Sequence, residues 1–67
     1  MFATSDDINK CKTLLQYILR DKGISLDDNS INEIVKKVLA LTYAKGGDYT
    51  DGSLEEYIRI YLRDHPV

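Results

Sequence analysis

The sequence of 67 residues contains a single cysteine, Cys11, a single histidine, His65, one proline and no tryptophan. One cysteine excludes an intrachain disulfide. One histidine and one cysteine are also too few to supply the four ligands of a structural zinc site. A domain this small therefore has to gain its stability from tight packing of its elements or from self-association.

Long apolar runs are also missing, and none approaches the roughly 20 residues of a membrane span. The sequence begins with residues 1–4, Met-Phe-Ala-Thr, and turns acidic at Asp6 and Asp7, which is the wrong charge for a signal peptide. A free thiol suits a reducing compartment. We therefore expect a cytoplasmic protein that does not associate with a membrane.

What the sequence does have is an ordinary globular composition, with 43% hydrophobic and 30% charged residues. Nine basic residues against eleven acidic residues give a net charge of −2, and the isoelectric point is near 5.1. This surplus of acidic residues mildly disfavours a phosphate-rich partner.

The first of three helical segments is predicted over residues 6–22. Thr4 or Ser5 can cap its amino end, and the acidic residues that follow suit the positive end of the helix dipole. Gly23 is expected to end the helix as a left-handed cap. The apolar residues recur at helical spacing along one stripe, which comprises Ile8, Cys11, Leu14, Leu15, Ile18 and Leu19.

The second segment is predicted over residues 30–45. Ser30 and Glu33 form a Ser-x-x-Glu capping box, although residues 27–29, Asp-Asp-Asn, are also good caps. The apolar positions spread over roughly 200° of the helix, and they are Ile31, Ile34, Val35, Val38, Leu39, Leu41 and Tyr43. This width predicts neighbours on two sides and a place at the centre of the domain.

The third segment is predicted over residues 53–64, after the pair Gly46-Gly47 has ended the second. Ser53 and Glu56 form another capping box. The inner face has the helical spacing and consists of Leu54, Tyr57, Ile58, Tyr61 and Leu62. The three segments predict an all-α fold, a three-helix bundle with short connecting loops in which residues 1–67 form a single domain.

No arrangement of side chains predicts catalysis. Nucleophilic catalysis needs a base beside Ser or Cys, and the one histidine lies among the last residues of the sequence. Cys11 lies on the apolar stripe, where a thiol packs as a small hydrophobe. The paired carboxylates fall at or just before helix starts, where capping and the helix dipole account for them. We therefore expect a protein that is not an enzyme and that uses no cofactor.

The loop over residues 47–52 superficially resembles a calcium-binding loop. If Gly52 takes the sixth position of that loop, Gly47 takes the first and Tyr49 the third, so only Asp51 fits as a ligand. We therefore expect no metal site.

DNA binding is the main alternative function, because three-helix domains often read DNA with a helix-turn-helix. Such readers join their last two helices by three or four residues, whereas the predicted connection between Lys45 and Ser53 has seven residues. The outward face of the third segment is charge-balanced rather than basic. Acidic residues interrupt the basic ones on the first two segments, which are Lys10, Lys12, Lys36, Lys37 and Lys45.

Four residues are candidates for binding a partner. Tyr17 and Tyr43 lie at the edges of their apolar stripes, and Tyr49 lies in a glycine-flanked loop with nothing local to pack on. Ile60 points about 160–200° away from Ile58 and Leu62 on its helix, so a lone bundle would leave it in water. Tyrosine is favoured at interfaces because a large apolar ring carries a polar tip.

These features predict a small, non-enzymatic interaction or regulatory protein that acts by binding another macromolecule. We expect that macromolecule to be a protein, and we expect the chain to self-associate as a homodimer. A compact dimeric DNA-binding domain is the alternative.

Overall fold

A computed structural model describes residues 4–65, and within this range it contains three helices and no strand. They are α1 (Ser5–Asp21), α2 (Asp28–Ala44) and α3 (Asp51–Asp64). Two loops of six residues connect them. The predicted all-α three-helix bundle is confirmed.

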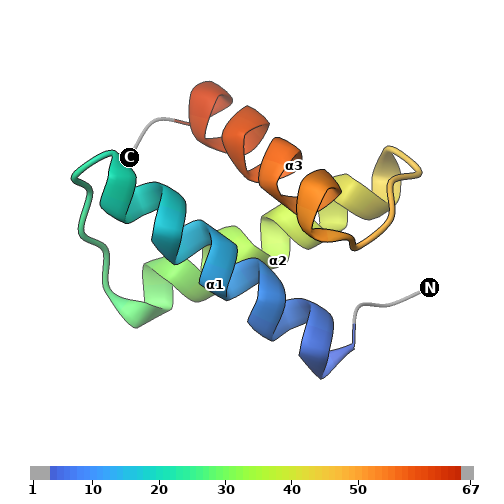
Figure 1. Ribbon diagram of the computed structural model, residues 1–67, viewed down its shortest axis with the longest axis horizontal. Coiled ribbons are helices and arrows are strands. Elements are labelled where there is room, and N and C mark those ends of the chain that lie inside the picture. Colours follow the sequence, from blue (N-terminus) through green and yellow to red (C-terminus); the bar gives the residue numbers. More distant parts are fainter. Residues whose placement is uncertain (1–3, 66–67) are drawn as a thin grey trace.

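The helices cross one another instead of lying in a flat row. Figure 1 shows α1 and α3 running from right to left in front of α2, which runs the opposite way behind them. Each helix contacts both of the others. The prediction that the second helix has neighbours on two sides is confirmed, and α1 and α3 also pack against each other, so each helix has two neighbours.

The helix starts differ from the predicted ones at α2 and α3. Thr4 caps α1, as expected, and forms a capping box with Asp7, with Thr4 Oγ1 accepting the Asp7 N–H at 3.2 Å. The cap of α2 is Asp27, whose carboxylate accepts the Ser30 N–H at 2.9 Å. The cap of α3 is Thr50. The Ser-x-x-Glu boxes predicted at Ser30 and Ser53 are thus wrong, and each helix begins two residues earlier. For α2, the alternative of a cap within residues 27–29 is confirmed by Asp27.

The residue that precedes each of these two caps explains the earlier start. Leu26 and Tyr49 are half-buried and pack against the core. Ile31 and Leu54, four residues into the helices after the caps, are buried. An apolar residue before the cap and one four residues into the helix is the arrangement of a hydrophobic staple, which fixes where the chain enters the helix.

Glycine ends α1 and α2 in the same way. Gly23 and Gly46 have φ angles of 72° and 73°, the left-handed region that is strained for other residues. The N–H of Ile24 donates to the Leu19 carbonyl at 2.9 Å, and the N–H of Gly47 donates to the Thr42 carbonyl at 2.9 Å. These are the long hydrogen bonds of Schellman motifs, as predicted at Gly23.

The core is a single cluster to which all three helices contribute. Ile8 was expected in it but is 42% exposed, and Thr42 was not expected but is fully buried. The Thr42 hydroxyl donates to the Val38 carbonyl at 2.8 Å, which satisfies it without a partner outside the helix. The buried apolar residues are Cys11, Leu15, Ile18, Leu19, Ile31, Ile34, Val35, Val38, Leu39, Leu54, Ile58 and Leu62.

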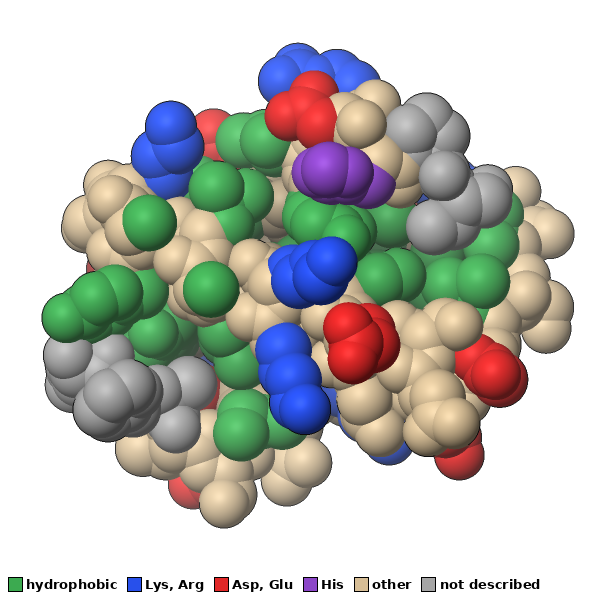
Figure 2. All heavy atoms as spheres, turned by 180° about the vertical axis from the view of Figure 1, so that it is seen from behind, with side chains coloured by type: hydrophobic (Ala, Val, Ile, Leu, Met, Phe, Trp, Pro, Cys, Tyr) green, Lys and Arg blue, Asp and Glu red, His purple; other side chains and the backbone are tan. Residues whose placement is uncertain are grey.

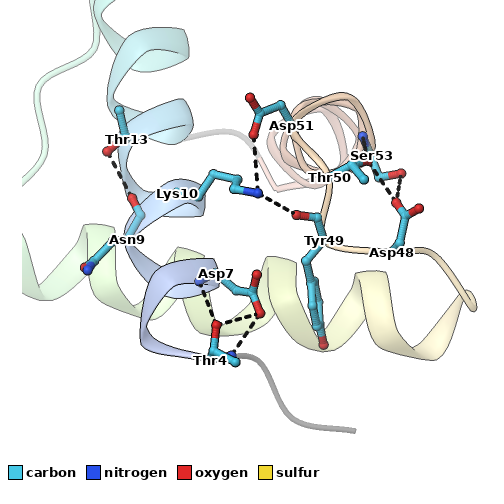
Figure 3. Close-up of polar contacts among 10 residues, drawn as sticks. All are labelled: Thr4, Asp7, Asn9, Lys10, Thr13, Asp48, Tyr49, Thr50, Asp51 and Ser53. Carbon is cyan, nitrogen blue, oxygen red and sulfur yellow. Dashed lines mark hydrogen bonds and ion pairs between the residues drawn. The ribbon is translucent and has the colours of Figure 1, made fainter.

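Lys10 ties α1 to the loop before α3. Its Nζ donates to the Tyr49 carbonyl at 3.2 Å and lies 3.6 Å from Asp51 Oδ1 (Figure 3). Helix periodicity alone does not predict the pair between Lys10 and Asp51, because the two residues lie on different helices.

Candidate functional site

A groove between α2 and α3, here called the α2–α3 groove, is the candidate site. Its volume is about 490 Å³, compared with about 360 Å³ for a hollow at the loop between α1 and α2 and about 270 Å³ for a hollow between α1 and α3 that includes Leu14 and Tyr17. The apolar floor is formed by four half-buried side chains, Leu41 from α2 and Tyr57, Ile60 and Tyr61 from α3.

Helix geometry accounts for this floor. Tyr57, Ile60 and Tyr61 follow one another at i, i+3 and i+4, so they lie together on the edge of α3 that faces α2. On α2, Leu41 lies at the edge of the wide apolar stripe. Since α2 is apolar over more of its circumference than its neighbours cover, this edge remains accessible to solvent.

Basic side chains border the floor on both helices. Lys37 on α2 and Lys45 at the carboxyl-terminal cap of α2 are exposed, each four residues from Leu41, and Arg63 is exposed on α3. We call these three residues the basic rim. Figure 2, which has α2 in front, shows Lys and Arg side chains among gathered hydrophobic ones.

One carboxylate, that of Asp64, also lines the groove. Asp64 Oδ1 lies 3.6 Å from Arg63 Nε, and both side chains are largely exposed, so water screens this pair strongly. The His65 ring stacks at a tilt on Tyr61, with their centroids 4.6 Å apart. The groove therefore holds three of the nine basic residues of the chain and one of its eleven acidic residues.

Ile60 is placed differently from the prediction. It is half-buried at the groove, so the expectation that a lone bundle would leave it in water is wrong. The reason is that Tyr57 and Tyr61 widen the apolar face of α3 toward Leu41. A solvent-accessible apolar floor remains, and Ile60 is part of it.

Tyr49 is also placed differently. Its side chain is half-buried and packs against the core, so the expectation that it has nothing to pack on is wrong. The hydrophobic staple at the start of α3 holds it there.

Tyr17 and Tyr43 are exposed, at 64% and 56%. Tyr17 lies on α1 beside Leu14 and Arg59, in the hollow between α1 and α3. Tyr43 is two residues from Leu41 on α2 and so projects about 200° away from it. The structure therefore does not bring the four candidate residues together, and only Ile60 lines the α2–α3 groove.

The other residues of the groove were not among the candidate binding residues that the sequence predicted. Tyr57 and Tyr61 read as core residues because of their spacing, and Lys37 and Lys45 read as parts of an interrupted basic cluster. One signal was present, since Lys37, Leu41 and Lys45 at i, i+4 and i+8 form a basic edge with an apolar centre.

The titratable groups with shifted pKa values all have structural roles. Burial raises the pKa of the Cys11 thiol to about 11, which keeps it protonated at neutral pH. Hydrogen bonds from Thr4 lower the pKa of Asp7, and those from Ser30 lower the pKa of Asp27. Hydrogen bonds from Ser53 and Thr50 lower the pKa of Asp48. Each of these carboxylates lies at or beside a helix start.

Within residues 4–65, no three side chains among His, Cys, Asp and Glu come close enough to hold a metal ion. No helix in that range combines the length and the apolar character that crossing a bilayer requires.

Comparisons of the chain with models of known protein families, with curated proteins and with solved structures found no match. Any function therefore has to rest on the geometry and chemistry of the chain itself.

Proposed function

We propose that this chain is a small, non-enzymatic interaction or regulatory protein that binds another protein through the α2–α3 groove. The observation that supports the proposal is the groove itself, an accessible floor of Leu41, Tyr57, Ile60 and Tyr61 between two packed helices. We also propose a cytoplasmic location, because the free thiol of Cys11 suits a reducing compartment.

The floor has the form used to bind a helix. An amphipathic helix places apolar side chains at i, i+3, i+4 and i+7 into a groove between two helices. Tyrosine and isoleucine supply large contact areas, and completing the burial of an isoleucine contributes up to roughly 1.5–3 kcal/mol. A few such residues dominate the affinity of an interface.

DNA binding is the competing function, and the basic rim is the observation in its favour. Two features oppose it. The connection between α2 and α3 has six residues, longer than the turn of a helix-turn-helix reader. The exposed side of α3 also carries Glu56 and Asp64 beside its arginines, which would repel phosphate.

The test is capture of partners by the tagged chain from cells of its own source, with and without nuclease, followed by mass spectrometry. We expect one or more proteins to be retained after nuclease treatment. They should be lost with Ile60→Lys, which places a charge on the groove floor, and kept with Asn32→Lys, which places the same charge at an exposed position of α2 outside the groove.

Partners that disappear with nuclease would favour the DNA alternative. Partners retained equally by both variants would contradict the groove as the binding surface. Circular dichroism of both variants checks that each is folded.

A further inference from the structure

The charge of the α2–α3 groove differs in sign from that of the chain. The chain carries a net charge of −2. At the groove, by contrast, the three basic residues Lys37, Lys45 and Arg63 outnumber the single acidic residue, Asp64. These three cations lie next to an apolar floor. The groove thus combines an apolar contact surface with a local positive potential.

We propose that the occupant of the groove is an amphipathic helix of a different protein, with acidic residues bordering its apolar face. This inference rests on the proposed function, namely that the groove binds a protein. The apolar face of the occupant contacts Ile60 and its neighbours on the floor, while its carboxylates face the basic rim.

The spacing of the two lysines in the basic rim determines the spacing that we expect between acidic residues of the bound helix. Lys37 and Lys45 are eight residues apart on α2, which corresponds to about 12 Å along the helix axis. A helix lying along α2 meets both lysines if it carries carboxylates about two turns apart on one edge. Arg63, on α3, borders the opposite side of the groove and can face an acid on the other edge of the occupant.

A second copy of this chain is a poorer occupant. In a two-fold dimer each subunit presents the same surface, so groove-to-groove packing would bring the three cations of one copy against those of the other. Duplex DNA would satisfy the cations but would leave the apolar floor of Leu41 and Ile60 without an apolar partner.

The experiment uses two designed peptides of about 18 residues, long enough to form a marginal helix. Both have the same Leu and Ala apolar face, and they differ only in carrying Glu or Lys beside it. Binding to the full chain is measured by fluorescence anisotropy at low and at physiological salt. We expect the Glu peptide to bind about tenfold more tightly than the Lys peptide, with a smaller difference at higher salt.

Two adjacent lysines provide a matched pair of variants. Lys37→Glu alters the basic rim, whereas Lys36→Glu makes the same change of net charge at an exposed position outside the groove. Lys37→Glu should reduce or reverse the preference for the Glu peptide, and Lys36→Glu should preserve it. Ile60→Lys should weaken binding of the Glu peptide through the loss of the apolar contact.

Several outcomes would overturn the inference. Equal binding of both peptides, abolished by Ile60→Lys, would refute the acidic partner while the protein-binding groove stands. Equal effects of Lys36→Glu and Lys37→Glu would show that net charge, and not the rim, sets the preference. Failure of both peptides to bind would refute the helical occupant, and Lys37-dependent binding of duplex DNA in place of either peptide would indicate a nucleic acid site.

Discussion

Tyr57 packs against the backbone at Gly47, so closely that a Cβ atom on residue 47 would lie 2.9 Å from Tyr57 Cε2. The same Cβ would lie 3.3 Å from Thr42 Cγ2. Gly47 donates the last hydrogen bond of the α2 end, and Tyr57 forms part of the groove floor. The end of α2 and the shape of the groove are therefore coupled through this contact.

The first prediction is that Gly47→Ala lowers the free energy of unfolding by about 1 kcal/mol, because the methyl group displaces the Tyr57 ring. Gly52→Ala is the control, since a Cβ there meets nothing within 4 Å. It should stabilise the protein by about 0.4–1 kcal/mol through the unfolded state. Urea unfolding measures both, and a stabilising Gly47→Ala would contradict the close contact.

The second prediction concerns Cys11, which is fully buried and whose pKa is raised from 9.0 to about 11. At pH 8 the native thiol should react with an aromatic disulfide reagent only as fast as the chain unfolds. Between pH 9 and 11 the unfolded thiol ionises and the folded one does not, so this residue makes stability fall as pH rises. Cys11→Ala should lack that contribution, although it lowers stability overall. Rapid modification in native buffer would show that the thiol is accessible.

The third prediction concerns acid unfolding. The pKa values of Asp7, Asp27 and Asp48 are lowered in the folded state by hydrogen bonds at helix starts. The stability that they contribute is present above their ordinary pKa of 3.8 and is lost as pH falls through the folded values. The urea concentration at the midpoint of unfolding should therefore fall as the pH is lowered below about 4. The variant with Asp→Asn at all three positions should show a weaker dependence of stability on pH. If its stability depends on pH as steeply as that of the wild-type chain, other carboxylates are responsible.

The fourth prediction is self-association of the isolated chain at micromolar concentration. A chain this short has a marginal core without a disulfide or a metal, and Tyr17 is 64% exposed beside the half-buried Leu14. Because the basic rim disfavours groove-to-groove contact, we expect the dimer to use the α1 surface at Tyr17. In sedimentation experiments Tyr17→Lys should give a monomer and Ile60→Lys should not. The opposite pattern would place the second copy in the groove, and a monomeric wild-type chain would refute self-association.

The helices and their ends illustrate how much local sequence determines. Apolar periodicity predicted three helices, and Gly23 was predicted as a left-handed cap, because both features depend only on residues within a few positions. The starts of α2 and α3 were less determined, since several good capping residues stand close together. Asp27 and Thr50 are the caps because Leu26 and Tyr49, just before them, pack against the core.

The groove marks the limit of such prediction. The sequence alone determined that α2 and α3 are amphipathic and that Lys37, Leu41 and Lys45 lie on one edge of a helix. It did not determine which edges meet, so Ile60 was predicted to lie in water, and Tyr57 and Tyr61, which do pack against the core, were not predicted to line a groove. Only the tertiary structure decided that these three side chains face Leu41 across α2 and α3. The physical reason is that periodicity gives the direction of a side chain around its own helix, whereas burial depends on how neighbouring helices cross.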